Sequence, residues 1–311
     1  MSSQLSKNIL ATIIYYDGLD YPLTAFEVWK YLIRMDYYNQ DEISIEVPLV
    51  EVIKNLESQE LFTYVRQLNG FYFLKDRQQL VKKRVNGSKI SSGKIKKLRR
   101  IVWLLRFVPY VRMIGVTGRL AMKNATIKSD WDLLIATKQG KIWTGRTLVT
   151  VLVHILGKRR YAEKVSNRLC LNFFVTDESL EVMTKDLYSA NEYMFMFPLF
   201  GWETYLRFQI KNHWIKGMKP HYGISELPPL KILSDSFCSK TIRKLGESVF
   251  GAAWIENLLR KVEKKRIMNN PKTHQEGSLV YANDDALVFL PNPHGPKIFD
   301  KFKEKVGQLS V

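Results

Sequence analysis

The stretch from residue 113 to residue 146 constrains the fold of this chain more than any other, because it joins two short apolar runs through a glycine. The first run, residues 113–117, predicts a strand that ends at Gly118. The second run follows a polar loop and alternates polar and apolar side chains, which places Asp130 and Asp132 on one face of a second strand. The stretch therefore predicts two strands, a glycine turn and a pair of neighbouring carboxylates.

The two carboxylates predict a metal site. Asp130 and Asp132 lie close enough on one strand face to share a divalent cation, and paired carboxylates repel each other unless a cation or proton lies between them. The turn at Gly118 offers backbone N–H groups with no Cβ in the way, which suits phosphate oxygens. A phosphate-binding turn next to metal-binding carboxylates is the set of groups that phosphoryl or nucleotidyl transfer requires. The alternative is that the carboxylates are ordinary solvent-facing strand residues.

The order of these residues resembles the DNA polymerase β-type nucleotidyltransferase superfamily. The matching elements are Thr117-Gly118, Asn124-Ala125 and the run Ser129-Asp130-Trp131-Asp132-Leu133-Leu134-Ile135. The chain is similar in particular to bacterial stand-alone nucleotidyltransferase-domain proteins that carry an N-terminal winged-helix-like domain. The motif covers about a tenth of the chain, and a weaker similarity extends over most of the rest.

The resemblance implies roles for individual residues. Asp130 and Asp132 would be the catalytic residues and the ligands of Mg²⁺ or Mn²⁺. A nucleoside triphosphate would be the donor substrate, and the residues expected to hold its phosphates are Gly118, Arg119, Lys123 and Arg146. The implied reaction moves a nucleoside monophosphate from the Mg²⁺-bound triphosphate to an acceptor hydroxyl, on nucleic acid or on another molecule.

Two positions depart from the family pattern and keep a second function open. Arg119 stands where the family usually has a serine, so that it either grips phosphate more strongly or blocks the pocket. Many members also carry a third carboxylate on a later strand, where this chain has Asn172, which cannot act as a base. The alternative function is therefore a non-catalytic nucleotide- or nucleic-acid-binding protein on a degenerate nucleotidyltransferase fold.

The pattern of elements predicts an α+β protein with four parts. They are a winged-helix-like domain at 1–78, a basic linker helix at 79–107, a mixed-sheet nucleotidyltransferase domain at 108–185, and a helical C-terminal region with a terminal hairpin at 186–311. In the last part we expect a buried helix over residues 193–202 and one long helix over residues 242–267.

In the first domain, Thr24 and Glu27 have the spacing of a capping box that begins a helix. The third predicted helix, residues 47–59, and its flank hold mainly carboxylates, which would repel the phosphates of DNA. This charge argues against a winged-helix transcription regulator. Residues 61–66 and 70–74 predict a hairpin.

The formal net charge of +18 favours polyanionic partners. Cationic side chains concentrate in residues 75–106, where we expect a contact with RNA or DNA or, alternatively, a solvated linker helix. The segments Asn86-Gly87-Ser88 and Ser91-Ser92-Gly93 predict a flexible break between two helical pieces of this stretch.

The cysteine spacing and the first residues of the chain predict a cytoplasmic protein. Cys170 and Cys238 lack the spacing of a disulfide frame or a zinc site, which favours a reducing cytoplasm. The first residues lack the pattern of a signal peptide. No uncharged apolar stretch reaches about 18 residues, so we expect neither a membrane span nor a membrane partner. The oligomeric state has no signal in the sequence.

Overall fold

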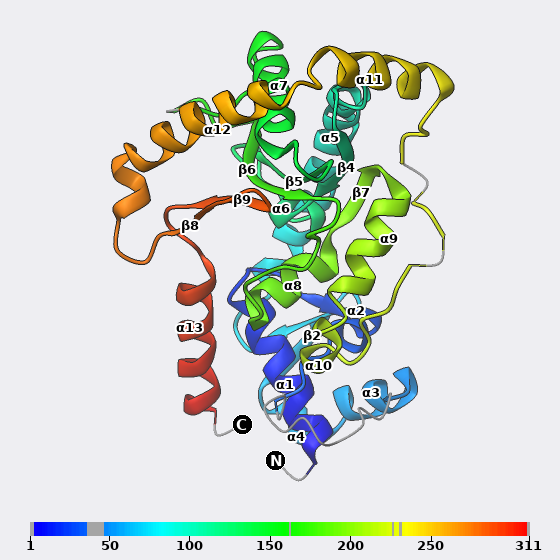
Figure 1. The fold of residues 1–311 in the computed structure, drawn as a ribbon. Helices are drawn as coiled ribbons and strands as arrows, with labels where there is room; N and C mark the ends of the chain where they lie inside the picture. Colours follow the sequence, from blue (N-terminus) through cyan, green and yellow to red (C-terminus); the bar gives the residue numbers. More distant parts are fainter. Residues whose placement is uncertain (1–2, 36–46, 162, 226, 230–231, 310–311) are drawn as a thin grey trace.

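The computed structural model describes residues 3–35, 47–161, 163–225, 227–229 and 232–309 (Figure 1). It contains a three-stranded sheet of order β1-β3-β2 and a six-stranded mixed sheet of order β7-β4-β5-β6-β9-β8. Helices surround both sheets, so the predicted α+β class is confirmed. Within the described ranges, no helix combines the length and apolar character needed to cross a membrane.

The small sheet belongs to the first part of the chain, which packs around the buried helix α1. Residues 36–46 of this predicted domain lie outside the described residues. The elements are α1 (Gln4–Asp17), β1 (Leu23–Thr24), α2 (Ala25–Lys30), α3 (Leu49–Leu56), α4 (Gln59–Phe62), β2 (Val65–Leu68) and β3 (Phe71–Leu74). The capping box is confirmed, because the Glu27 amide donates to Thr24 Oγ1 at 3.2 Å and the Thr24 amide donates to Glu27 Oε2 at 3.0 Å.

The predicted hairpin is present, with a later start. Asn69 and Gly70 join β2 to β3 with φ values of 52° and 78°, as a tight two-residue turn requires. The predicted first strand began at residue 61, whereas Leu61 lies in α4 and is fully buried. Ser58 caps that short helix by accepting a hydrogen bond from the Leu61 amide, so the strand begins only at Val65.

The basic stretch forms one continuous helix, α5 (Gln79–Leu105), so the predicted flexible break is wrong. The small residues serve packing instead. A Cβ at Gly87 would lie 3.3 Å from the Cα of Asn124, and Ser91 Oγ accepts a hydrogen bond from the Ala125 amide at 3.0 Å. Gly87 and Ser91 therefore let the loop after the glycine turn lie directly on α5.

Two cations of the basic stretch are part of the fold. Lys94 is buried and its Nζ donates to the carbonyl oxygens of Ile127 and Ser129 at 3.0 and 2.7 Å. Arg84 forms an ion pair with Glu27 at 2.8 Å. These two side chains fix the loop before Asp130 and the N-terminal part of α5, and are not free to contact a polyanion.

The large sheet begins with the elements of the central stretch. They are β4 (Val111–Val116), α6 (Gly118–Ala121), β5 (Trp131–Thr137), α7 (Ile142–Ile155) and β6 (Leu169–Thr176). β4 and β5 pair antiparallel, and β5 and β6 pair parallel with α7 as their crossover. Alternation along β5 sends Trp131, Leu133 and Ile135 into the core beneath α5 and α7. Leu134 and Ala136 enter the core on the opposite face.

The sheet continues beyond the predicted boundary at residue 185. α8 (Leu187–Phe195) is followed by β7 (Phe197–Phe200), which pairs with β4, so the prediction of a helix over 193–202 is wrong. Pro198 explains the change, because proline breaks a helix but is tolerated on an edge strand such as β7. At the other edge, β9 (Ala286–Leu290) pairs with β6 and with β8 (Leu279–Ala282), which confirms the terminal hairpin.

The remaining helices cover the sheet. They are α9 (Trp202–Lys211), α10 (Ile215–Met218), α11 (Phe237–Val249), α12 (Ala253–Met268), the 3₁₀ helix η1 (Pro271–His274) and α13 (Gly295–Gln308). The single long helix predicted over 242–267 is therefore two helices. Gly251 lies in the break, where it avoids the cost of about 1 kcal/mol that glycine imposes inside a helix.

Candidate metal centre

Three potential metal ligands meet at the start of β5 and β6. A carboxylate oxygen of Asp130, one of Asp132 and the Sγ of Cys170 all lie within 4.8 Å of one another. The strand register explains the meeting, because Asp132 is the direct partner of Cys170 across the parallel pair. The structure thus brings the two predicted carboxylates together and adds a thiol.

The glycine turn lies against this cluster. Gly118 has a φ of +63°, and a Cβ on it would lie 2.6 Å from Asp132 Oδ2. The Thr117 amide also donates to the backbone oxygen of Asp132 at 3.1 Å. Glycine is therefore needed twice, for its left-handed conformation and for the close approach of the Asp132 carboxylate.

One guanidinium compensates part of the negative charge. Nη1 of Arg160 lies 2.6 Å from Asp130 Oδ2 and donates to Cys170 Sγ at 3.3 Å. The Arg160 side chain is 43 % exposed, so the pair stands at the rim of the cluster and remains in contact with solvent. A cation bound by Asp130 would have to share or replace this ion pair.

A third carboxylate approaches from α8. Glu192 accepts hydrogen bonds from the side chains of Tyr188 and Thr117 and from the backbone of Gly118. Loss of water raises the pKa of Glu192, and these three donors lower it. Glu192 therefore fixes the turn at Thr117 and Gly118 from the side of the sheet that carries Asp132.

The cluster carries excess negative charge. Burial, then the charge of Asp130, then that of Glu192 raise the pKa of Asp132 well above its ordinary value, and Arg160 opposes this rise. Burial, followed by the charge of Asp132, raises the pKa of the Cys170 thiol to about 12, so the thiol is protonated at neutral pH. Hard divalent cations such as Mg²⁺ and Mn²⁺ prefer carboxylate oxygens, which makes Asp130 and Asp132 the ligands that fit them.

The predicted phosphate-binding residues do not all reach the cluster. Arg119 and Lys123 are exposed on and just after the turn. Arg146 lies on α7, where it forms an ion pair with Glu263 and its guanidinium stands 4.7 Å from the ring centre of Phe289. This is the face of Trp131 and Leu133, opposite to that of Asp132, so the structure does not bring Arg146 to the carboxylates.

The strand expected to hold a third carboxylate offers none at the cluster. Asn172 lies where the register between β5 and β6 shifts, between the partners of Asp132 and Leu134. Asp177 follows the far end of β6, where it accepts a hydrogen bond from the Gln139 amide at 2.8 Å. The acidic group nearest to this role is Glu192, which comes from a helix.

Sequence reasoning did not assign Arg160, Cys170 or Glu192 to the site. Cys170 and Asp132 could have been matched by aligning the two predicted strands in parallel. Arg160 and Glu192 are 30 and 60 residues away from Asp130 and Asp132, and no local spacing indicates their contacts.

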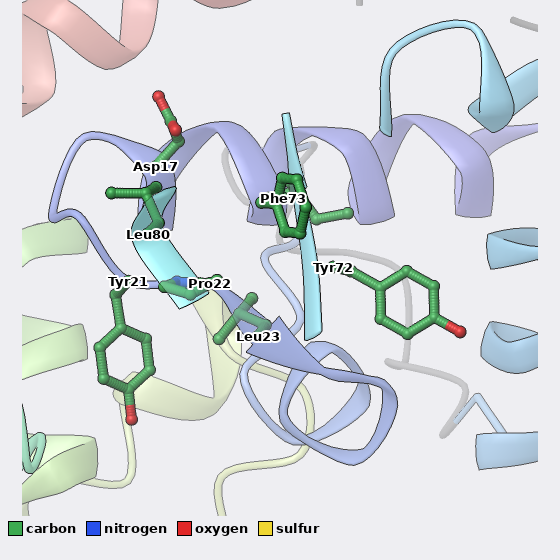
Figure 2. A pocket seen from close by; sticks show the side chains of 8 residues that line it. Asp17, Tyr21, Pro22, Leu23, Tyr72, Phe73 and Leu80 are labelled. Carbon is green, nitrogen blue, oxygen red and sulfur yellow. The ribbon is translucent and has the colours of Figure 1, made fainter. Parts of the chain in front are cut away.

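A separate hollow lies in the first part of the chain, among Tyr21, Leu23, Phe73 and Leu80 (Figure 2). It is too tight to admit a water molecule. Asp17 borders it, but its carboxylate points away from the apolar side chains and forms ion pairs with Arg77 and Lys305 (Figure 2). These contacts give Asp17 a structural role and leave the carboxylate cluster as the candidate site.

The comparisons with known proteins assign no family. No protein-family model matches the chain, no curated protein matches it, and no solved structure matches it.

Proposed function

We propose that this protein is a metal-dependent nucleotidyltransferase of the DNA polymerase β type. The observation that carries the proposal is the convergence of Asp130 and Asp132 against the glycine turn at Gly118. Two carboxylates that share one strand end, beside a turn that only glycine can form, fit a Mg²⁺ or Mn²⁺ ion and the triphosphate that it accompanies.

The reaction forms a bond from an acceptor hydroxyl oxygen to the α-phosphorus of a nucleoside triphosphate. The bond from that phosphorus to the bridging oxygen breaks, pyrophosphate leaves, and the hydroxyl proton passes to solvent. The metal supplies Lewis-acid polarisation of the phosphoryl oxygens when bound. Asp130 and Asp132 hold it, Glu192 fixes the turn, and the exposed cations Arg119 and Lys123 offset the charge of the outer phosphates.

Two further features support this proposal. Helices α1 to α4 followed by the β2–β3 hairpin are compatible with a winged-helix-like domain. The carboxylates Glu51, Glu57 and Glu60, on α3 and directly after it, favour substrate positioning over DNA reading. On α5, exposed cations form a surface that suits RNA or DNA, and its members are Lys82, Lys89, Lys96, Lys97 and Arg100. We place this activity in the cytoplasm, where Cys170 stays a free thiol.

Label transfer from α-phosphate-labelled nucleoside triphosphates tests the proposal. The protein is incubated with each nucleotide, with Mg²⁺ or Mn²⁺, and with total RNA, total protein or no added acceptor. We expect label in one acceptor pool, none with Asp130→Asn, and full labelling with the control Glu178→Gln, whose exposed side chain follows the far end of β6. Absence of label from every pool, together with no nucleotide binding, would contradict the proposal.

One observation favours the non-catalytic alternative. Arg160 already forms an ion pair with Asp130, which competes with a metal ion for that carboxylate. Nucleotide binding that depends on metal and on Asp132, without transfer to any acceptor, would identify the protein as a nucleotide-binding member of this fold.

A further inference from the structure

Two consecutive helices, α11 and α12, lie one after the other across one end of the molecule (Figure 1). Their inner sides are anchored. On α11, Arg243 donates to the backbone oxygen of Arg106 at 2.7 Å. On α12, Glu256 accepts hydrogen bonds from the amides of Trp143 and Thr144 at 2.9 and 3.0 Å. These contacts fix which side of each helix faces away from the protein.

Every carboxylate of the two helices lies on the inner side, where it contacts the rest of the protein. Glu247 of α11 pairs with Arg112 at 2.8 Å, and Glu263 of α12 pairs with Arg146. Glu256 is buried. The sequence of α11 and α12 contains no other acidic residue, so their outer side carries none.

Large apolar side chains occupy the outer side instead. Phe237 is 86 % exposed, Val249 71 % and Trp254 66 %. The exposed apolar residues of the two helices are Phe237, Ile242, Leu245, Val249, Trp254, Leu258, Val262 and Met268. Single exposed apolar residues are common on proteins, but eight on two adjacent helices indicate a binding surface.

Cations stand among these apolar residues. The exposed lysines are Lys240, Lys244, Lys261, Lys264 and Lys265. We call these cations and the eight apolar residues together the outer face of α11 and α12. It combines apolar and positively charged groups without a single carboxylate.

The combination of apolar and positively charged side chains favours one class of partner over others. A second copy of the chain would bring five lysines against five like charges. A nucleic acid would satisfy the cations but leave the apolar side chains in water. An anionic lipid bilayer satisfies both, because aromatic and aliphatic groups enter the boundary below the headgroups while lysines extend to the headgroup phosphates.

We propose that the outer face of α11 and α12 binds the surface of an anionic lipid membrane. Such binding needs no spanning segment, so it replaces the expectation of no membrane partner that followed from the sequence. α12 packs on α7, on the face of the sheet opposite to Asp132, so the bound protein keeps its carboxylate cluster away from the lipid. The proposal is thus independent of nucleotidyl transfer.

Vesicle flotation at low salt tests this proposal on the full chain. The probes are vesicles of phosphatidylcholine alone and vesicles of phosphatidylcholine with phosphatidylglycerol. We expect flotation only with the anionic vesicles, and its loss as salt is raised. Lys261→Gln, Lys264→Gln and Lys265→Gln combined lower the partition coefficient on the order of a hundredfold.

Matched variants separate this surface from others. Leu245→Ser with Leu258→Ser abolishes flotation, whereas Ile127→Ser with Leu227→Ser, at two more exposed apolar positions elsewhere, leaves it unchanged. Lys82→Gln, Lys89→Gln and Lys96→Gln on α5 control for general charge. Three results would overturn the proposal: no flotation with anionic vesicles, equal loss with the α5 variant, or a concentration-dependent dimer in light scattering that the Leu245 and Leu258 changes abolish.

Discussion

The two faces of the central sheet both enclose charged side chains, but they balance them differently. On the α7 face, the Arg146 guanidinium is paired with the Glu263 carboxylate and lies over the ring of Phe289. Burial and the nearby positive charges of Arg159 and Arg266 lower the pKa of Arg146. On the α8 face, Asp130, Asp132 and Glu192 converge around the guanidinium of Arg160, and the Lys94 ammonium adds positive charge near Asp130. The first arrangement pairs its largely buried guanidinium directly with a carboxylate of the protein, whereas the second gathers three carboxylates around one guanidinium and leaves net negative charge in a partly buried site.

The difference distinguishes a structural ion pair from a binding centre. Enclosed charge of one sign raises the free energy of the folded state unless a counter-charge arrives. On the α8 face the raised pKa of Asp132 is the sign of that cost. A divalent cation relieves it, which is why we assign function to the α8 face and stability to the α7 face.

The largest expected effect comes from breaking the Arg146–Glu263 ion pair on the α7 face. Glu263→Ala leaves the Arg146 guanidinium enclosed without its partner and should lower the free energy of unfolding by about 3–5 kcal/mol. Urea denaturation measures this loss, and Mn²⁺ binding by the folded fraction should stay at the level of the parent. A loss below about 1 kcal/mol would mean that solvent reaches the pair.

The second effect concerns the glycine turn on the α8 face of the sheet. Gly118→Ala places a Cβ against Asp132 Oδ2 and a side chain at positive φ, so we expect a loss of about 1–3 kcal/mol together with weaker metal binding. Gly93→Ala is the matched control. A Cβ at Gly93 would meet open space, and an alanine in α5 should stabilise by up to about 1 kcal/mol. Equal behaviour of the two variants would contradict the role given to Gly118.

The third effect is a gain in stability that depends on pH. Because the pKa of Asp132 is raised in the folded state, the folded protein holds this proton more tightly than the unfolded chain does. The contribution of Asp132 to the free energy of unfolding therefore falls as pH rises above about 4, the ordinary pKa of aspartate. Asp132→Asn should raise the melting temperature by a few degrees at neutral pH and leave it unchanged near pH 4. Thermal unfolding of both proteins between pH 4 and pH 7 measures the two melting temperatures.

The smallest effect sharpens the role of Arg160. Arg160→Gln frees the Asp130 carboxylate from its ion pair, so Mn²⁺ alone should bind a few-fold more tightly. If this guanidinium also faces the triphosphate, nucleotide affinity should fall in the same variant. Calorimetric titrations with Mn²⁺ and with nucleotide measure the two constants, and a weaker Mn²⁺ affinity would show that Arg160 supports the ligands.

Local signals in the sequence predicted much of the fold and part of the site. The Asn69-Gly70 turn, the Thr24–Glu27 capping box and the alternation along residues 131–136 each depend on near neighbours, and each is present in the structure. The predicted strand began at residue 129, whereas β5 begins at Trp131 and Asp130 directly precedes it. The terminal hairpin was found in the same way.

Contacts between distant segments decided the rest. α5 continues through Gly87 because a loop 37 residues later packs against it, and β7 forms because β4 offers it an edge. The sequence did not show which face of the sheet α7 covers. Arg146 on α7 was therefore predicted to bind phosphate, although it lies on the face opposite to Asp132. Arg160 and Glu192 reach the carboxylates through the fold alone.

Binding of Mn²⁺, followed by the loss of its free electron paramagnetic resonance signal, tests whether Asp130 and Asp132 form a divalent-cation centre. We expect one saturable site in the parent protein, loss of that site in Asp132→Asn, and an unchanged site in Glu178→Gln. Equal Mn²⁺ binding by the parent and Asp132→Asn, or no saturable site in the folded parent, would contradict the assignment of the metal centre.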